Sequence, residues 1–114
     1  VDTLITDLKS QQLLSMAGEK GSAAAQQPHG IFVQPSSYAL FAASSYNAGD
    51  TNNYAIAAGP GAMFSTTFPS TQVVFAKGDG AVSSFVNGSN TITVTARGDS
   101  RVLTLDRFGA ISTN

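Results

Sequence analysis

The spacing of the apolar residues changes once along this chain, and that change constrains the fold more than any other feature. In the first segment, VDTLITDLKSQQLLSMAGEKG, four apolar residues follow the i, i+3, i+4, i+7 spacing of one buried helix face. These residues are Val1, Leu4, Ile5 and Leu8. Glycines follow near the end of the segment, where they are helix stop signals. We therefore predict an amphipathic helix over residues 1–18.

Beyond Gln12 the apolar residues of this helix cover more of its circumference. They are Leu13, Leu14, Met16 and Ala17. We expect the first turns to pack on one side and the later turns to be buried more deeply. The chain begins with Val1 and has no N-cap residue before the helix, so we also expect that the helix once continued upstream.

From Gly30 onward the sequence changes to short β-type runs. GIFVQ and SYALFAA, joined by a Pro-Ser-Ser turn, predict a hairpin, and YAIAAG, AMFSTTF and TQVVFAK predict three more strands. TITVTA and RVLTLD alternate threonine with apolar residues, and RFGAIS predicts a last short strand. We therefore expect one α+β domain over residues 1–114, with the helix packed on a mostly antiparallel β-sheet head at residues 30–114. The expected core residues are Leu4, Leu8, Phe32, Tyr38, Phe41, Phe75, Val94, Leu103 and Leu105.

The composition excludes several classes of protein. With 114 residues and 42% hydrophobic residues, the chain can bury a core without a metal or a disulfide. Its formal net charge is −1, which gives no basic footprint for a general nucleic-acid binder. It has no cysteine, so thiol catalysis, cysteine-based zinc sites and disulfides are excluded. Charged residues make up 11% of the chain, under half the usual quarter, which is more common outside the cytoplasm than inside it.

The residues that carry chemistry elsewhere are sparse in this sequence. His29 is the single histidine, and its Pro-His-Gly context favours a surface or turn role over catalysis. Asp50, Asn52 and Asn53 place oxygen ligands at alternating positions, like the start of a calcium loop. The glycine and the terminal glutamate of such a loop are missing, which favours a solvated loop. We therefore expect no enzyme activity and no cofactor.

The tetrapeptide Arg97-Gly98-Asp99-Ser100 has the sequence that many adhesion ligands present to integrins. It lies between two strongly patterned strands, where a hairpin needs a turn. Gly98 can supply the positive φ of such a turn, so we predict Gly98-Asp99 as a two-residue hairpin loop. The turn is favoured over an adhesion signal.

Three of the six basic residues lie in this C-terminal part of the chain. They are Arg97, Arg101 and Arg107. Asp99 and Asp106 lie among them, so the segment has a net charge of only +1. We therefore interpret these arginines as charges that keep a strand edge soluble, in preference to contacts with DNA.

Taken in order, several short motifs resemble the soluble part of GspH/FimT-type pseudopilins and minor type IV pilins. GIFVQPSSYALF resembles the strand pair that follows the helix in this family, VVFAKGDGAVSS resembles its strand-turn element, and ITVTARGDSRVLTLDRFGAIS resembles its closing strands. The matching positions are Gly30, Phe32, Pro35, Tyr38, Leu40, Phe41, Phe75, Gly80 and Gly109.

This resemblance implies a structural subunit that acts by assembly. The family's N-terminal helix half, which is not in this chain, anchors in the inner membrane, and the head lies in the periplasm or at the cell surface. Its partners are other pilin or pseudopilin subunits and the machinery of secretion or pilus assembly. The resemblance does not separate a type II secretion pseudopilus from a type IV pilus.

The resemblance also assigns candidate site residues. The packed helix face would begin with Val1, Leu4, Ile5 and Leu8. Some FimT-like minor pilins bind DNA through a basic Gly-Arg-x-Arg motif near the C-terminus, which makes Arg97, Arg101 and Arg107 the candidate DNA contacts. This sequence interrupts the motif with acids, which disfavours the DNA role. A tip adhesin that acts through Arg97-Gly98-Asp99 is a third hypothesis.

Overall fold

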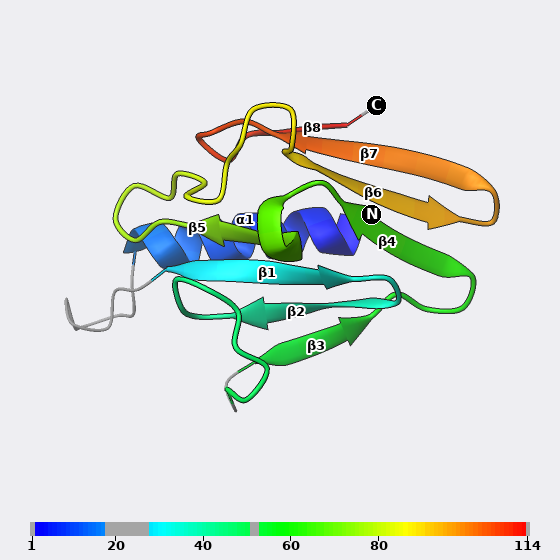
Figure 1. Ribbon diagram of the computed structural model, residues 1–114, viewed down its shortest axis with the longest axis horizontal. Helices are drawn as coiled ribbons and strands as arrows, with labels where there is room; N and C mark the ends of the chain where they lie inside the picture. Colours follow the sequence, from blue (N-terminus) through cyan, green and yellow to red (C-terminus); the bar gives the residue numbers. More distant parts are fainter. Residues whose placement is uncertain (1, 18–27, 51–52, 114) are drawn as a thin grey trace.

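The computed structural model describes residues 2–17, 28–50 and 53–113, which form one α-helix followed by eight β-strands (Figure 1). The helix, α1, spans Asp2–Ala17, so it agrees with the predicted helix within one residue at each end; Val1 and Gly18 lie outside the described residues. The remaining elements are β1 (His29–Gln34), β2 (Ser37–Phe41), β3 (Tyr54–Ala57), β4 (Ala62–Thr66), the 3-10 helix η2 (Pro69–Thr71), β5 (Gln72–Phe75), β6 (Thr91–Ala96), β7 (Asp99–Leu105) and β8 (Ile111–Thr113).

The strands form two sheets, and every pairing is antiparallel. One sheet has the order β3-β2-β1-β5 and the other the order β4-β6-β7-β8. The α+β class, with one helix first and antiparallel strands after it, is confirmed. The expectation of a single sheet is wrong, because β4 does not pair with β3 after the Gly-Pro-Gly loop. It pairs with β6 instead, and residues 67–90, which include β5, lie between these two strands in the sequence.

The first hairpin follows the sequence pattern directly. β1 and β2 pair from Gly30↔Phe41 to Gln34↔Ser37, which leaves Pro35-Ser36 as a two-residue loop. This is the hairpin predicted from GIFVQ, the Pro-Ser-Ser turn and SYALFAA. β5 then pairs along the other side of β1, so β1 is a central strand and is mostly buried.

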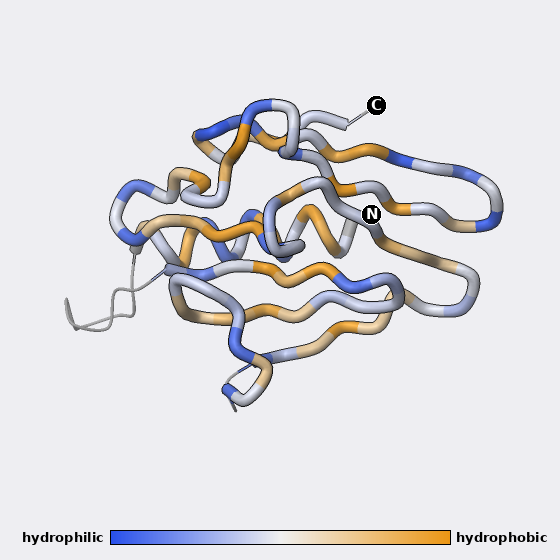
Figure 2. The backbone as a smooth tube through the Cα atoms, in the orientation of Figure 1, coloured by the Kyte–Doolittle hydropathy of each residue, from blue (hydrophilic) through white to orange (hydrophobic). Residues whose placement is uncertain are grey.

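Backbone hydrogen bonds join the two sheets at two places. The Phe64 amide of β4 donates to the Pro35 carbonyl in the β1–β2 turn at 2.8 Å. Beyond β5, the Val82 amide donates to the Arg107 carbonyl at 2.8 Å, and Val82 also forms a bridge with Phe75. α1 packs against β1 and β5 (Figure 1), and the apolar stretches of these strands appear orange in Figure 2.

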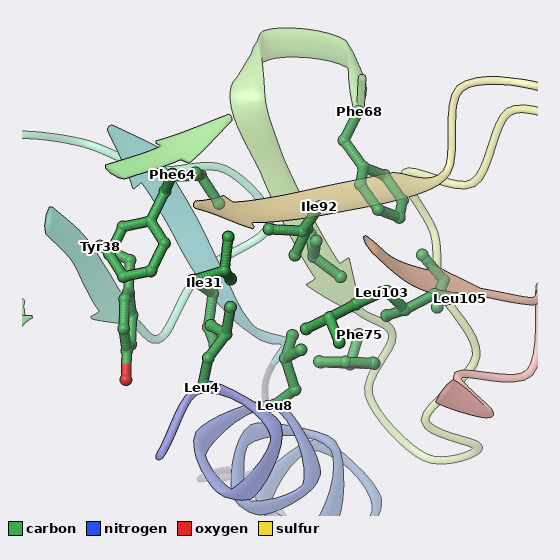
Figure 3. Packing of buried hydrophobic residues seen from close by; sticks show 14 residues of the cluster. Leu4, Leu8, Ile31, Tyr38, Phe64, Phe68, Phe75, Ile92, Leu103 and Leu105 are labelled. Carbon is green, nitrogen blue, oxygen red and sulfur yellow. The ribbon is translucent and has the colours of Figure 1, made fainter. Parts of the chain in front are cut away.

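The core lies between the helix and the two sheets. Figure 3 shows Leu4 and Leu8 reaching from α1 toward side chains of both sheets, among them Ile31 and Leu103. The buried apolar residues are Leu4, Leu8, Ile31, Val33, Tyr38, Ala39, Phe41, Phe64, Phe68, Val73, Val74, Phe75, Val82, Ile92, Val94, Leu103 and Leu105.

Of the nine predicted core residues, eight are buried and Phe32 is not. Phe32 is half-buried, and its ring stacks on that of Tyr46 with a centroid distance of 4.0 Å. Side chains alternate along a strand, so Phe32 lies on the opposite face of β1 from the buried Ile31 and Val33. The strand was predicted correctly, but the face on which Phe32 lies was not.

The second half of the helix departs from the prediction. Leu13, Leu14 and Met16 are 63%, 42% and 44% exposed, whereas Gln11 and Ser15 are buried. The later turns therefore do not bury these three apolar residues more deeply, and the side chain of Ala17 lies outside the described part of the chain. The buried face continues from Leu4 and Leu8 through two polar residues, because positions 4, 8, 11 and 15 follow one another along the same side of a helix.

Truncation of Leu8 should destabilise the domain strongly. Its side chain is fully buried between α1 and the sheets, so Leu8→Ala should lower the free energy of unfolding by about 2–5 kcal/mol. Leu13→Ala is the matched control, because the same truncation at a side chain that is 63% exposed should cost under about 0.5 kcal/mol. Urea unfolding of both variants measures the difference, and equal losses would contradict the placement of the helix.

Candidate functional site

A row of polar side chains attaches the second half of α1 to the sheets. The Gln11 side-chain amide, which is buried, donates to the Gly30 carbonyl at 2.8 Å and to the Phe41 carbonyl at 3.0 Å. These two carbonyls belong to the last paired residues of β1 and β2. A side chain at Gly30 would overlap the Val73 carbonyl and the Phe41 ring, so glycine is required where these strands meet the helix.

Ser15 continues this row one turn later. Its hydroxyl donates to the Gln11 carbonyl at 3.0 Å and accepts from the His29 amide at 2.9 Å. Its own carbonyl accepts from the Gly78 amide at 2.9 Å. Ser15 therefore links the helix to the start of β1 and to the turn after β5.

Gln12 connects the same helix to the second sheet. Its side-chain amide donates to the Phe108 carbonyl at 2.7 Å and to the Gly80 carbonyl at 3.1 Å. Phe108 lies in the turn between β7 and β8. We call Gln11, Gln12 and Ser15 the polar seam. It sets the rotation of α1, because its members must face the sheets to reach these backbone partners.

The polar seam leaves apolar side chains on the outside of the helix. We define the outer helix face as Leu13, Leu14 and Met16, each of which is more than two-fifths exposed. Phe108, in the neighbouring turn, is 71% exposed. Between the helix and this turn lies an open groove of about 400 Å³, lined by Lys9, Gln12, Leu13, Phe108, Gly109, Ala110 and Ile111. Leu13 and Phe108 line this groove together, and exposed apolar side chains that lie together are typical of a contact surface.

The residues assigned to the packed helix face contact the domain itself. Leu4 and Leu8 are buried in the core, and Ile5 is half-buried and packs against it. Val1 lies outside the described residues. The apolar residues that remain exposed on the helix are those of the outer helix face. The sequence contained a signal for this exposed face. Gln11 and Ser15 continue the line of Leu4 and Leu8 along one side of the helix, which leaves Leu13 on the opposite side.

A second cleft, of about 460 Å³, opens between the two sheets near the start of α1. Its lining is mostly apolar and includes Thr3, Leu4, Tyr38, Ile56, Ala57, Ala58, Ala62, Phe64, Val94 and Ala96. The Tyr38 hydroxyl donates to the Asp7 carboxylate. Burial of Tyr38, followed by its hydrogen bond to Asp7 and the charge of that carboxylate, raises the pKa of the Tyr38 hydroxyl well above its usual range. Tyr38 therefore keeps its proton to a higher pH than an unperturbed tyrosine does.

Ionisation of Tyr38 should destabilise the domain at alkaline pH. Below about pH 10 the tyrosine is protonated in the folded and unfolded states alike. Above that, the unfolded chain loses the proton while the raised pKa retains it in the folded state. The free energy of unfolding should therefore fall by up to about 1.4 kcal/mol per pH unit.

Tyr38→Phe tests this effect, because phenylalanine keeps the ring and removes the ionisable group. Urea unfolding at about pH 8 and about pH 11 should show a smaller loss of stability for Tyr38→Phe than for the wild type. All other residues are the same in the two proteins, so the difference between the two losses reports on Tyr38. Parallel losses in the two proteins would contradict the raised pKa.

His29 lies in a strand and not in a surface loop. It is the first residue of β1, opposite Phe75 of β5, and its side chain is only 7% exposed. The expectation of a surface or turn role is therefore wrong. Tertiary packing of the helix end over this strand buries a residue whose local sequence is typical of a loop.

The loop at Asp50 is organised by its own hydrogen bonds. The Asp50 amide donates to the Asn47 carbonyl at 3.0 Å, and the Asn53 side chain donates to the same carbonyl at 2.6 Å. Asn52 lies outside the described residues. Among the residues that the structure describes, no group of three acidic or histidine side chains is arranged to hold a metal ion.

The Arg97-Gly98-Asp99-Ser100 segment forms a hairpin turn, but one residue earlier than predicted. Ala96 of β6 pairs with Asp99 of β7, so the two-residue loop is Arg97-Gly98 and Asp99 belongs to the strand. Both loop residues have positive φ, 53° and 84°. Positive φ at both central positions is the signature of a type I′ turn, whose twist matches the flanking strands.

The three arginines do not form a cluster. Arg97 is in the turn before β7 and Arg107 follows its far end, about 20 Å away along the strand. Arg107 lies over the ring of Phe85, with its guanidinium carbon 5.6 Å from the ring centroid. Arg101 is exposed on β7. The positions of these arginines therefore do not favour contact with DNA over the other interpretation, in which they keep an exposed strand soluble.

If the tetrapeptide is only a turn, its backbone should matter and its side chains should not. A Cβ atom at Gly98 would meet no neighbour within 4 Å, so Gly98→Val tests backbone strain alone. It should lower the free energy of unfolding by about 1 kcal/mol or more, as measured by thermal melting. Asp99→Glu should leave stability unchanged. Cell adhesion by the wild type that disappears in Asp99→Glu would instead make the segment a ligand.

No family model, curated protein or solved structure matches this chain. The resemblance to minor pilins and pseudopilins therefore rests on the short motifs identified in the sequence. None of the helices in the described residues is long and apolar enough to cross a bilayer.

Proposed function

We propose that this chain is a structural subunit of a pilus-like filament, a minor type IV pilin or a type II secretion pseudopilin, that acts by assembly and carries out no catalysis. Its partners are other subunits of the filament and the assembly machinery. The proposed location is the cell envelope, with the head described above in the periplasm or at the cell surface. The observation that carries this proposal is the outer helix face.

The outer helix face suits a subunit contact for a physical reason. Leu13, Leu14 and Met16 are exposed although apolar residues of this size are usually buried. Their exposure is not loose packing, since the polar seam fixes the rotation of α1 through hydrogen bonds of 2.7–3.1 Å. A rigid helix with an apolar outer side can bury that side against a neighbouring subunit at little cost in conformational entropy.

The rest of the surface is consistent with such a role. Charged residues make up only 11% of the chain, so neighbouring copies would meet little long-range repulsion. The clefts are lined mainly by apolar and small side chains. These features favour association over chemical catalysis.

Assembly should fail when the outer helix face becomes polar. The test variant replaces Leu13 and Leu14 by serine in the full-length protein, in the cells that make it. Filaments are sheared from the cells or pelleted from lysed envelopes, and the chain in the filament fraction is quantified by immunoblotting. We expect at least about a tenfold loss, since each leucine that is no longer buried forfeits roughly 1.5–3 kcal/mol.

Met63→Ser is the matched control. Met63 is 58% exposed but lies on β4, so its replacement removes exposed apolar surface away from the helix and should leave assembly unchanged. Circular dichroism should show that the variants remain folded, because none of these side chains is in the core. An unchanged filament fraction for the double variant, or absence of the wild-type chain from every filament fraction, contradicts the proposal.

A further inference from the structure

The outer edge of β3 has hydrogen-bonding groups that face away from the domain. β3 is the terminal strand of its sheet and pairs with β2 alone. The Ala58 amide donates to the Ser36 carbonyl on the β2 side. Because these groups alternate along an antiparallel strand, the amides and carbonyls of Ala55 and Ala57 point outward. Within the described part of the chain, no other segment pairs with this edge.

The other long edges of the two sheets are partly covered. At β4, the Phe64 amide donates to the Pro35 carbonyl. At β5, the following loop lies alongside the strand: Val82 bridges to Phe75, and the Ser83 amide donates to the Val74 carbonyl. The remaining edge strand, β8, has only three residues. β3 is therefore the longest uncovered edge in the described residues.

This edge also lacks three of the features that usually prevent strands from pairing between molecules. Natural edge strands carry lysines, prolines or bulges that block such pairing. β3 reads Tyr-Ala-Ile-Ala, pairs with β2 in continuous register, and has no charged residue from 53 to 63. Figure 2 shows none of the deep blue of charged residues along it. Tyr54, at its start, is 65% exposed.

We propose that β3 is a self-association edge, at which the β3 strands of two copies pair antiparallel about a two-fold axis. The two four-stranded sheets would then form one sheet of eight strands. A second copy fits this edge because each β3 supplies the amides and carbonyls that the other lacks. An uncharged strand also meets itself without like-charge repulsion. Two-fold pairing closes at a dimer, so this contact is separate from the assembly contact proposed for α1.

Space for a second strand exists on the inner side of β3. The cleft of about 460 Å³ is lined there by Ile56, Ala57 and Ala58, and across it by the small side chains of Ala62 and Ala96. The inner face of the sheet is thus not filled at this edge. A neighbouring strand could place alternate side chains in the cleft without displacing the core.

Sedimentation velocity over a range of concentrations, combined with amide NMR shifts, tests the proposal on the purified 114-residue chain. A pair of four-residue strands is a small contact, so we expect a weak dimer with a dissociation constant on the order of 10⁻⁴ M. The amide shifts that depend on concentration should centre on residues 53–58. A chain that stays monomeric, or shifts centred on Leu13, Met16 and Phe108, would overturn the proposal.

A charge placed on the edge should abolish the pairing selectively. Ala55→Lys brings two like charges together at the two-fold contact and should weaken dimerisation at least about tenfold. Thr104→Lys is the matched control, since it adds the same charge at an exposed position of β7, in the other sheet. Circular dichroism verifies that both variants fold. Equal dimerisation by Ala55→Lys and Thr104→Lys would also overturn the proposal. The filament assay of the variant with serine at positions 13 and 14 tests the proposed function, and its result does not depend on this dimerisation assay.

Discussion

The two hydrogen bonds from the Gln11 side chain to the Gly30 and Phe41 carbonyls are the contact on which the rest of the arrangement depends. A buried amide without partners would cost about 1–3 kcal/mol, so Gln11 must face the end of the β1–β2 pair. Ser15 and Gln12 extend the same requirement to the start of β1 and to the turns after β5 and β7. Because one helix makes all these bonds, its rotation and its position relative to both sheets are set together.

The exposed apolar side chains follow from that rotation. With Leu4, Leu8 and the polar seam facing inward, Leu13 must face outward, since it lies on the opposite side of the helix. The domain thus has a polar contact inside the second half of α1 and an apolar surface outside it. This arrangement leaves an ordered apolar surface for the partner proposed above.

Two surfaces with different physical properties result. The outer helix face offers apolar side chains on a rigid helix, which suits the proposed contact between unlike surfaces of neighbouring subunits. The edge of β3 offers backbone hydrogen bonds and almost no side-chain specificity, which suits a symmetric contact between identical strands. The hairpin at Arg97-Gly98 and the dispersed arginines add no third surface, because their side chains lie along an exposed strand and its turn.

The sequence by itself determined the features that depend on neighbouring residues. The helix, the β1–β2 hairpin and the alternating β6 and β7 strands follow from local periodicity, and eight of nine predicted core residues are buried. The exact loop at Arg97-Gly98, the burial of His29 and the face on which Phe32 lies were decided by tertiary structure. So were the division into two sheets and the inward position of Gln11 and Ser15. Each of these depends on which distant backbone group a residue meets, and hydrophobic periodicity carries no information about such partners.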